Sequence, residues 1–178
     1  MGDRSFHFVG SLVPTQHQDL LGVSRKQMRR LDKTRLPAVW SYRTRKVVFG
    51  VERTVLCTFN KALFVSQTKT LSREIRKRTR RLQTLKVRLE RRRKGSPGKA
   101  PTVDGVQNQL KEILRGRHMA DLFTVRVRKS SEGLPRLSFR IRDKAYHHLC
   151  STLLGKTIIF TNRTDWTDEQ IVLGYRAQ

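Results

Sequence analysis

Residues 123–142 read FTVRVRKSSEGLPRLSFRIR, and two runs within this stretch alternate apolar and polar side chains. Such alternation is typical of strands with one buried face, and the turn residues 130–133 lie between the runs. The stretch therefore predicts a β-hairpin. The face expected to be buried contains Phe123, Val125, Val127, Leu137, Phe139 and Ile141. The opposite face is expected to carry five arginines: Arg126, Arg128, Arg136, Arg140 and Arg142.

The arginine face of this hairpin suggests phosphate binding. Guanidinium groups are planar forks that match phosphate oxygens, and no acid interrupts the arginines within either run. The alternative is an ordinary solvated strand face, although such faces usually mix charges of both signs. We therefore expect the hairpin to contact a DNA backbone.

A long amphipathic helix is predicted upstream, over residues 66–94. Its leucines and isoleucine recur every three or four residues, and Arg78 fills the one missing apolar position. Residues 66–100 contain 14 Lys and Arg and two acids, so this part carries a net charge of +12. The basic end of the helix suits either nucleic acid or the carbonyls of a helix C-terminus. The candidate DNA contacts here are Arg76, Arg80, Arg91, Arg92, Arg93 and Lys94.

The remaining patterns predict an α+β chain with five parts. Strands are expected over 5–12, 46–49 and 53–59 within a strand-rich segment 1–65, where residues 15–40 read as loop with a short helix. The basic helix 66–94 is followed by a Gly- and Pro-rich linker, 95–102. A second helix and the hairpin occupy 103–154. Residues 155–178 contain a strand and a helix start, at which Thr167 and Gln170 have capping-box spacing.

Composition makes nucleic acid the expected partner. The 178 residues include 39 Lys and Arg against 14 Asp and Glu, a net charge of +25. A polyanion neutralises such an excess and releases its counterions on binding. The hydrophobic share of 37% is still sufficient for a core, so wholesale disorder is not expected.

Several classes of protein are disfavoured by the sequence. There is no apolar run long enough to span a bilayer, and two cysteines give no disulfide framework, so we expect a chain of the reducing cytoplasm. His147, His148 and Cys150 lack metal-ligand spacing. No phosphate loop or nucleophile elbow occurs, and the one close set of acids is Asp165, Asp168 and Glu169. The chain alone does not read as an enzyme.

The C-terminal stretch 155–178, GKTIIFTNRTDWTDEQIVLGYRAQ, resembles insertion-sequence DDE transposases. In that family an apolar strand ending in Thr-Asn or Thr-Asp, then Asp-Trp and a helix start, precedes a signature of Tyr, two residues, Arg, three residues, Glu, six residues and Lys. Tyr175 takes the first place of the signature. Gln178 stands where the family has Arg. The contact made by that Arg would then be missing unless the neighbouring Arg176 supplies it. Residues 8–12, 42–46 with Phe49-Gly50, and 53–60 resemble the same proteins more loosely.

This resemblance implies a partial RNase-H-like fold with an inserted helical and β-hairpin subdomain. It also implies that the catalytic aspartates precede Met1 and that the catalytic glutamate follows Gln178. The expected function is then double-stranded DNA binding at transposon ends, in the bacterial nucleoid, by a truncated transposase that is inactive alone. Intact relatives use Mg²⁺, whereas this fragment is expected to hold no cofactor, and an intact transposase is an expected partner.

Two other functions fit the composition. A small basic RNA-binding or ribosome-associated protein would also explain the pI near 11.5 and the basic hairpin. Its weakness is the ending Tyr175-Arg176-Ala177-Gln178, which lacks a helix C-cap. An active nuclease of another type is disfavoured because the acids are scattered singly through basic surroundings.

Overall fold

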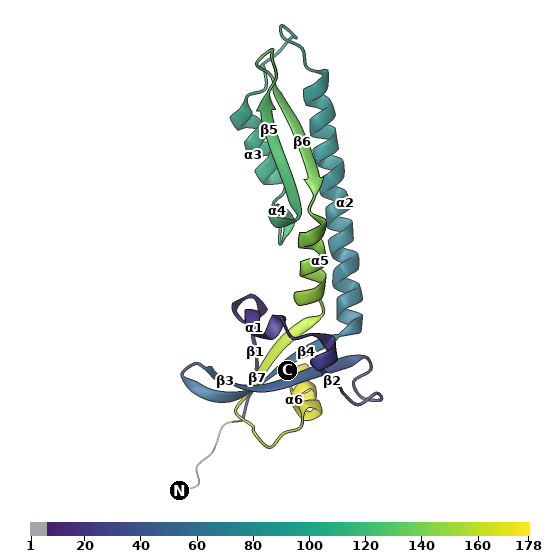
Figure 1. Ribbon diagram of the computed structural model, residues 1–178, viewed down its shortest axis with the longest axis vertical. Coiled ribbons are helices and arrows are strands. Elements are labelled where there is room, and N and C mark those ends of the chain that lie inside the picture. Colours follow the sequence, from purple (N-terminus) through teal and green to yellow (C-terminus); the bar gives the residue numbers. More distant parts are fainter. Residues whose placement is uncertain (1–6) are drawn as a thin grey trace. The chain divides into compact units, whose positions relative to one another are not determined.

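Two antiparallel sheets organise the chain, each in its own compact unit. The computed structural model describes residues 7–178 (Figure 1). Unit 1 comprises the described residues up to Thr68 together with Leu149–Gln178, and unit 2 comprises Lys69–His148. The predicted α+β class is confirmed, because the strands pair antiparallel and the helices lie outside the sheets.

The sheet of unit 1 has the order β1-β7-β4-β3-β2, and every neighbouring pair is antiparallel. The strands are β1 (Val9–Leu12), β2 (Arg29–Arg30), β3 (Val39–Val48), β4 (Val51–Asn60) and β7 (Lys156–Thr161). The first two residues of the strand predicted over 5–12 lie outside the described residues. The central strands β4 and β7 pair from Thr54 with Thr161 to Phe59 with Lys156, although they lie far apart in the sequence.

The predicted hairpin around Gly50 is confirmed, but β3 is much longer than the four residues expected. Phe49 and Gly50 both have positive φ, at 53° and 77°, as a two-residue turn of the primed type requires. β3 begins at Val39, inside the stretch expected to be loop. Ser41 and Arg43 occupy inward positions of β3, where an alternating pattern would have apolar residues. They are polar because both donate to Asp168 on another element, so the sequence did not read as a strand.

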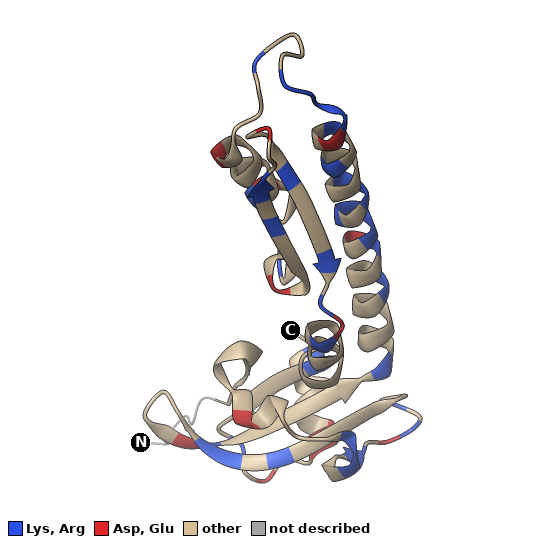
Figure 2. Ribbon diagram, turned by 45° about the horizontal axis from the view of Figure 1, so that its top comes forward, with Lys and Arg blue, Asp and Glu red and all other residues tan. Residues whose placement is uncertain are grey.

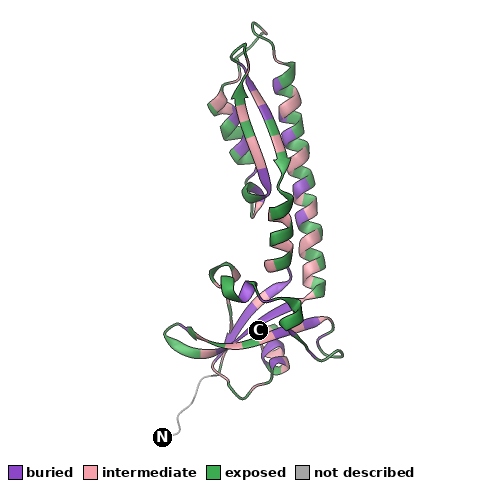
Figure 3. Ribbon diagram, in the orientation of Figure 1, coloured by how far each residue is buried: buried purple, intermediate pink, exposed green. Residues whose placement is uncertain are grey.

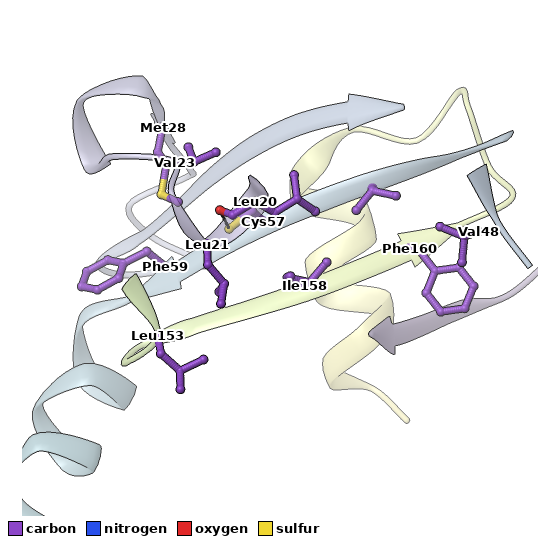
Figure 4. Packing of buried hydrophobic residues seen from close by; sticks show 11 residues of the cluster. Leu20, Leu21, Val23, Met28, Val48, Cys57, Phe59, Leu153, Ile158 and Phe160 are labelled. Carbon is purple, nitrogen blue, oxygen red and sulfur yellow. Dashed lines mark hydrogen bonds between the residues drawn. The ribbon is translucent and has the colours of Figure 1, made fainter. Parts of the chain in front are cut away.

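Both faces of the unit 1 sheet are covered at its central strands, which explains why residues 54–59 of β4 are all buried (Figure 3). On one face, Val55, Cys57 and Ile158 pack against the segment that contains the short helix α1 (Gln18–Leu21) and the 3-10 turns η1 (Pro14–Gln16) and η2 (Arg25–Gln27), as Figure 4 shows. On the other, Leu56 and Ile159 pack against the helix α6 (Asp168–Arg176). The predicted capping box of α6 is present between Thr167 and Gln170.

Two buried polar groups fix the α1 segment to the sheet. The Lys156 ammonium donates to the carbonyl oxygens of Leu21 at 2.5 Å and Val23 at 2.8 Å. The Cys57 thiol donates to the carbonyl of Leu20 at 3.3 Å. Burial raises the pKa of the Cys57 thiol to about 11 and lowers the pKa of the Lys156 ammonium. Both groups therefore serve as buried hydrogen-bond donors.

The long helix α2 (Lys61–Arg91) begins in unit 1 and continues through unit 2. It starts five residues before the predicted Ser66, because the Asn60 side chain caps it by accepting from the backbone of Ala62 and Leu63. It ends at Arg91, three residues before the predicted Lys94. The predicted apolar stripe is confirmed: its buried residues are Leu71, Ile75, Leu82, Leu85 and Leu89.

Unit 2 combines most of α2 with shorter helices and a two-stranded sheet. Helix α3 (Val103–Ile113) is capped by Thr102 and buries Val106, Leu110 and Ile113. The single turn α4 (Met119–Leu122) follows, then β5 (Phe123–Lys129), β6 (Pro135–Ile141) and the helix α5 (Asp143–Thr152). Phe123 pairs with Ile141 and Val127 with Leu137, so the predicted hairpin and its two faces are confirmed. The expected burial of Ile141 is wrong, because it ends the hairpin and is 37% exposed.

Candidate nucleic-acid interface

Most of the charge excess lies in unit 2. Residues 69–148 contain 24 Lys and Arg and seven acids, a net charge of +17, against +8 for the remainder of the chain. Figure 2 shows the cations concentrated along α2 and on the β5–β6 hairpin. Two basic surfaces can be defined there, and each follows from the periodicity of its element.

The first surface is a line of exposed cations on α2, which we call the helix stripe. Its members recur every three or four residues and so lie on one side of the helix. Five of them line a shallow hollow, and two more continue the line toward the C-terminal end. The helix stripe comprises Arg73, Arg76, Lys77, Arg80, Arg81, Arg88 and Arg91.

The two acids of α2 do not neutralise the helix stripe. Glu74 pairs with Arg78, and Glu90 lies 3.8 Å from Lys86, each within one turn of helix. Arg78 occupies the core position that the sequence leaves without an apolar residue, and its side chain is 13% exposed. It also donates to the carbonyl of Arg115 at 2.9 Å. Arg78 is thus a packing residue, and the stripe beside it remains wholly cationic.

The second surface is the outward face of the β5–β6 hairpin, which we call the ribbon patch. Arg126 stands opposite Ser138, and Arg140 stands opposite Thr124. These four side chains line one hollow, so two guanidiniums and two hydroxyls surround a space on the surface. The exposed Arg128 lies two residues further along β5. The set of donors suits a phosphate group, because guanidinium and hydroxyl groups both donate to its oxygens.

Three of the predicted DNA-contacting arginines instead bind backbone carbonyls of unit 2. Arg136 donates to the carbonyl of Leu89, near the end of α2. Arg142 donates to the carbonyl of Asp121 at 3.2 Å. Arg92 donates to carbonyls of the following loop, at 2.7 Å for Pro97 and 2.6 Å for Gly98. These guanidiniums hold the hairpin, α4 and the loop in place.

The other predicted contacts remain available to a ligand. Within residues 7–178, no ion pair or hydrogen bond engages the charged groups of Arg76, Arg80, Arg91, Arg93, Lys94, Arg126, Arg128 and Arg140. All eight residues are exposed. The structure therefore divides the eleven arginines and lysines that the sequence nominates into eight exposed cations and three structural ones.

The residues of the proposed transposase signature lie at the end of α6. Tyr175 is half-buried and packs against the core that contains Val9 and Ile171. Arg176 is exposed. The Gln178 amide donates to the carbonyl of Val9 at 2.8 Å, so it joins the end of the chain to the edge strand β1.

The acidic and metal-ligating side chains of the described residues are scattered or engaged in internal contacts. No cluster of three or more His, Cys, Asp or Glu that could hold a metal ion occurs in the described residues. Asp168 is buried and accepts from Ser41 at 2.6 Å and from Arg43 at 3.1 Å, while Arg163 donates to Asp165.

Over residues 7–178 no helix is both long and apolar enough to cross a membrane.

Comparisons with known protein families, curated proteins and solved structures find no match. The assignment therefore depends on the chain's own residues. Alternation found the arginines of the ribbon patch, and helical spacing found Arg76, Arg80 and Arg91 of the helix stripe. The sequence reading missed Thr124 and Ser138, whose place beside Arg126 and Arg140 depends on the hairpin register. It also missed the other four members of the helix stripe, which are Arg73, Lys77, Arg81 and Arg88.

Proposed function

We propose that this chain binds the sugar-phosphate backbone of double-stranded DNA through the helix stripe and the ribbon patch. The observation that carries the proposal is the group of eight exposed cations that lack an internal partner among residues 7–178. Like charges held together without acids repel one another, and a polyanion relieves that repulsion. Each phosphate neutralised releases condensed counterions, which makes the binding favourable at low salt.

The form of both surfaces supports a duplex as the ligand. Residues 73–91 of α2 span about 27 Å of helix, along which the cations lie in a line. That length corresponds to about eight base pairs of duplex. A two-stranded ribbon such as β5–β6 also fits a DNA groove. Backbone contacts of this kind position a protein on DNA without reading its sequence.

We further propose that the chain is a DNA-binding piece of an insertion-sequence DDE transposase, with the RNase-H-like part in unit 1 and the insertion in unit 2. The resemblance of residues 155–178 supports this, as does the position of unit 2 within the sequence of unit 1. Mg²⁺-dependent strand transfer would then need carboxylates that residues 7–178 do not bring together. The expected ligand is a transposon end, and the expected activity of the chain alone is binding.

Fluorescence anisotropy with a labelled 30-base-pair DNA duplex tests the proposal. The double variant Arg76→Ala/Arg80→Ala should weaken binding about tenfold or more, and so should Arg126→Ala/Arg140→Ala. The control is Lys111→Ala/Lys144→Ala, which removes the same charge from exposed positions outside both surfaces and should change the affinity less than threefold. Equal losses in all three variants would show that only net charge matters.

Competition with RNA separates DNA binding from the RNA-binding alternative. Unlabelled duplex DNA, duplex RNA and single-stranded RNA of equal length are added to the preformed complex. The proposal predicts that duplex DNA displaces the label at the lowest concentration. Displacement at tenfold lower concentrations of either RNA would instead assign the two basic surfaces to RNA.

A further inference from the structure

The turn between β3 and β4 exposes apolar side chains that the core does not use. Val47, Phe49 and Val51 are 71%, 79% and 53% exposed. They account for half of the six exposed large hydrophobic residues in the described chain, and all three lie within five residues. We call these three residues the β3–β4 tip. An apolar group this concentrated marks a contact surface rather than scattered surface residues.

Phe49 is an unfavourable residue for its backbone conformation. Its φ of 53° lies in the left-handed region, where Asn, Asp or Gly are the usual residues of a two-residue hairpin turn. The fold would therefore be easier to form with Asn at this position. A bulky residue kept in such a conformation points to a role outside the fold.

The Phe49 ring is held in a defined orientation even though most of it is exposed. It forms a T-shaped pair with the ring of Phe160, with a centroid distance of 5.7 Å and an interplanar angle of 64°, and Phe160 in turn meets Phe8 at 5.7 Å. Figure 4 shows Phe160 beside Val48, where β3 approaches its turn. A fixed aromatic ring with a free face is what proteins use to stack on a nucleobase, because little freedom is lost on binding.

The cations around the β3–β4 tip outnumber their acidic partners by one. Arg43 pairs with Asp168 and Lys46 with Asp19, whereas Arg53 forms no ion pair within residues 7–178 and donates to the carbonyl of Val48. Arg45 and Glu52 face each other at 3.2 Å, with 59% and 60% of their side chains exposed. An exposed pair of this kind contributes little to stability, so Arg45 can exchange Glu52 for a phosphate.

We propose that the β3–β4 tip is a nucleobase-binding site, at which Phe49 stacks on a base that has left the DNA helix. This inference rests on the proposed DNA binding. The two basic surfaces would contact phosphates, and the β3–β4 tip would add a contact to a base. Apolar side chains inserted at base steps unstack them, and a two-residue turn makes the tip narrow enough to enter a groove.

The test compares two duplexes that differ by one unpaired adenine. The full chain should bind the duplex with the unpaired base about fivefold or more tightly than the fully paired duplex. Phe49→Trp should keep this ratio. Phe49→Asn should bring the ratio to about one and leave the affinity for the paired duplex unchanged. Because Asn tolerates the left-handed conformation, the Tm of this variant should lie within a few degrees of the wild-type Tm.

Each other outcome has a defined meaning. An unchanged ratio in Phe49→Asn would overturn the base-binding site and leave the proposed DNA binding intact. A dimer of the wild type that Phe49→Asn converts to monomer, with no change in the ratio, would assign the tip to self-association instead. Failure of the wild type to bind either duplex would overturn the proposed function and this inference with it.

Discussion

Arg128 and Arg136 stand directly opposite each other on β5 and β6, yet their guanidiniums have different surroundings. Arg128 is exposed, whereas Arg136 is half-buried and donates to the carbonyl of Leu89 near the C-terminal end of α2. Like charges directly across a ladder repel. The carbonyl end of a helix attracts a cation, so turning Arg136 toward α2 relieves that repulsion and joins the hairpin to the helix.

This difference predicts opposite effects for two similar substitutions. Arg136→Ala should lower the free energy of unfolding by about 1.5 kcal/mol, because it removes a charged hydrogen bond to a partly buried carbonyl. Arg128→Ala should change it by less than about 0.5 kcal/mol. Urea denaturation measures both values. In DNA titrations Arg128→Ala should have the larger effect. It should lower the magnitude of the slope of the logarithm of the binding constant against the logarithm of salt concentration by about one. Equal stability losses would show that Arg136 is not a structural residue.

The loop after α2 provides a second pair of neighbouring arginines. Arg92 donates to the carbonyls of Ser96, Pro97 and Gly98, whereas the Arg93 side chain is exposed. Arg92→Ala should therefore speed amide hydrogen exchange over residues 95–99 by about tenfold, while Arg93→Ala should leave exchange unchanged and weaken DNA binding. The same exchange rates in both variants would contradict the role given to Arg92.

The fold was predictable wherever the pattern is local. The leucines of α2 and the alternation of β5 and β6 each repeat within one element, so the sequence alone predicts both and even the faces of the hairpin. The beginning of β3 was not predictable, because Ser41 and Arg43 read as loop residues until Asp168 is placed beside them. The start of α2 was missed because Asn60 is both the last residue of β4 and the helix cap.

The candidate site follows the same rule. Spacing alone predicts which arginines share a face, but it cannot predict which of them meet a carbonyl. Leu89 lies 47 residues before Arg136 in the sequence, and only the packing of the hairpin near α2 brings them together. The place of the Thr124 and Ser138 hydroxyls in the ribbon patch was not predictable either, because the register across the hairpin decides which residues stand beside them.

The buried Asp168 predicts a large effect in unit 1. Its carboxylate accepts from Ser41 and Arg43, so Asp168→Ala leaves both donors without that acceptor inside the protein. The free energy of unfolding should fall by about 3 kcal/mol. Asp165→Ala is the matched control, because Asp165 is 61% exposed and its pair with Arg163 should contribute little to stability. Similar losses for the two variants, measured by urea denaturation, would contradict this account of Asp168.

The two cysteines should differ in reactivity. Cys57 is fully buried and its thiol has a pKa of about 11, whereas Cys150 is half-buried. A thiol reagent at pH 8 should therefore label Cys150 in the native chain and Cys57 only after unfolding. Rapid labelling of both thiols in the native chain would contradict the burial of Cys57.

The raised pKa of Cys57 also predicts a loss of stability at high pH. Above about pH 9 the unfolded chain releases the Cys57 proton while the folded chain keeps it up to about pH 11. The folded state thus binds more protons in this window, and the free energy of unfolding falls as the pH rises. Urea titrations between pH 8 and 11 should show a steeper fall in the wild type than in Cys57→Ala. Parallel curves would contradict the raised pKa.

The salt dependence of DNA binding tests the central claim most directly. Each phosphate contact contributes about −0.9 to the slope of the logarithm of the binding constant against the logarithm of salt concentration. With eight exposed cations available, we expect a slope steeper than about −3 for a 30-base-pair duplex, reduced by about two in Arg76→Ala/Arg80→Ala. A slope near zero, or no binding at low salt, would contradict the claim that these surfaces hold duplex DNA.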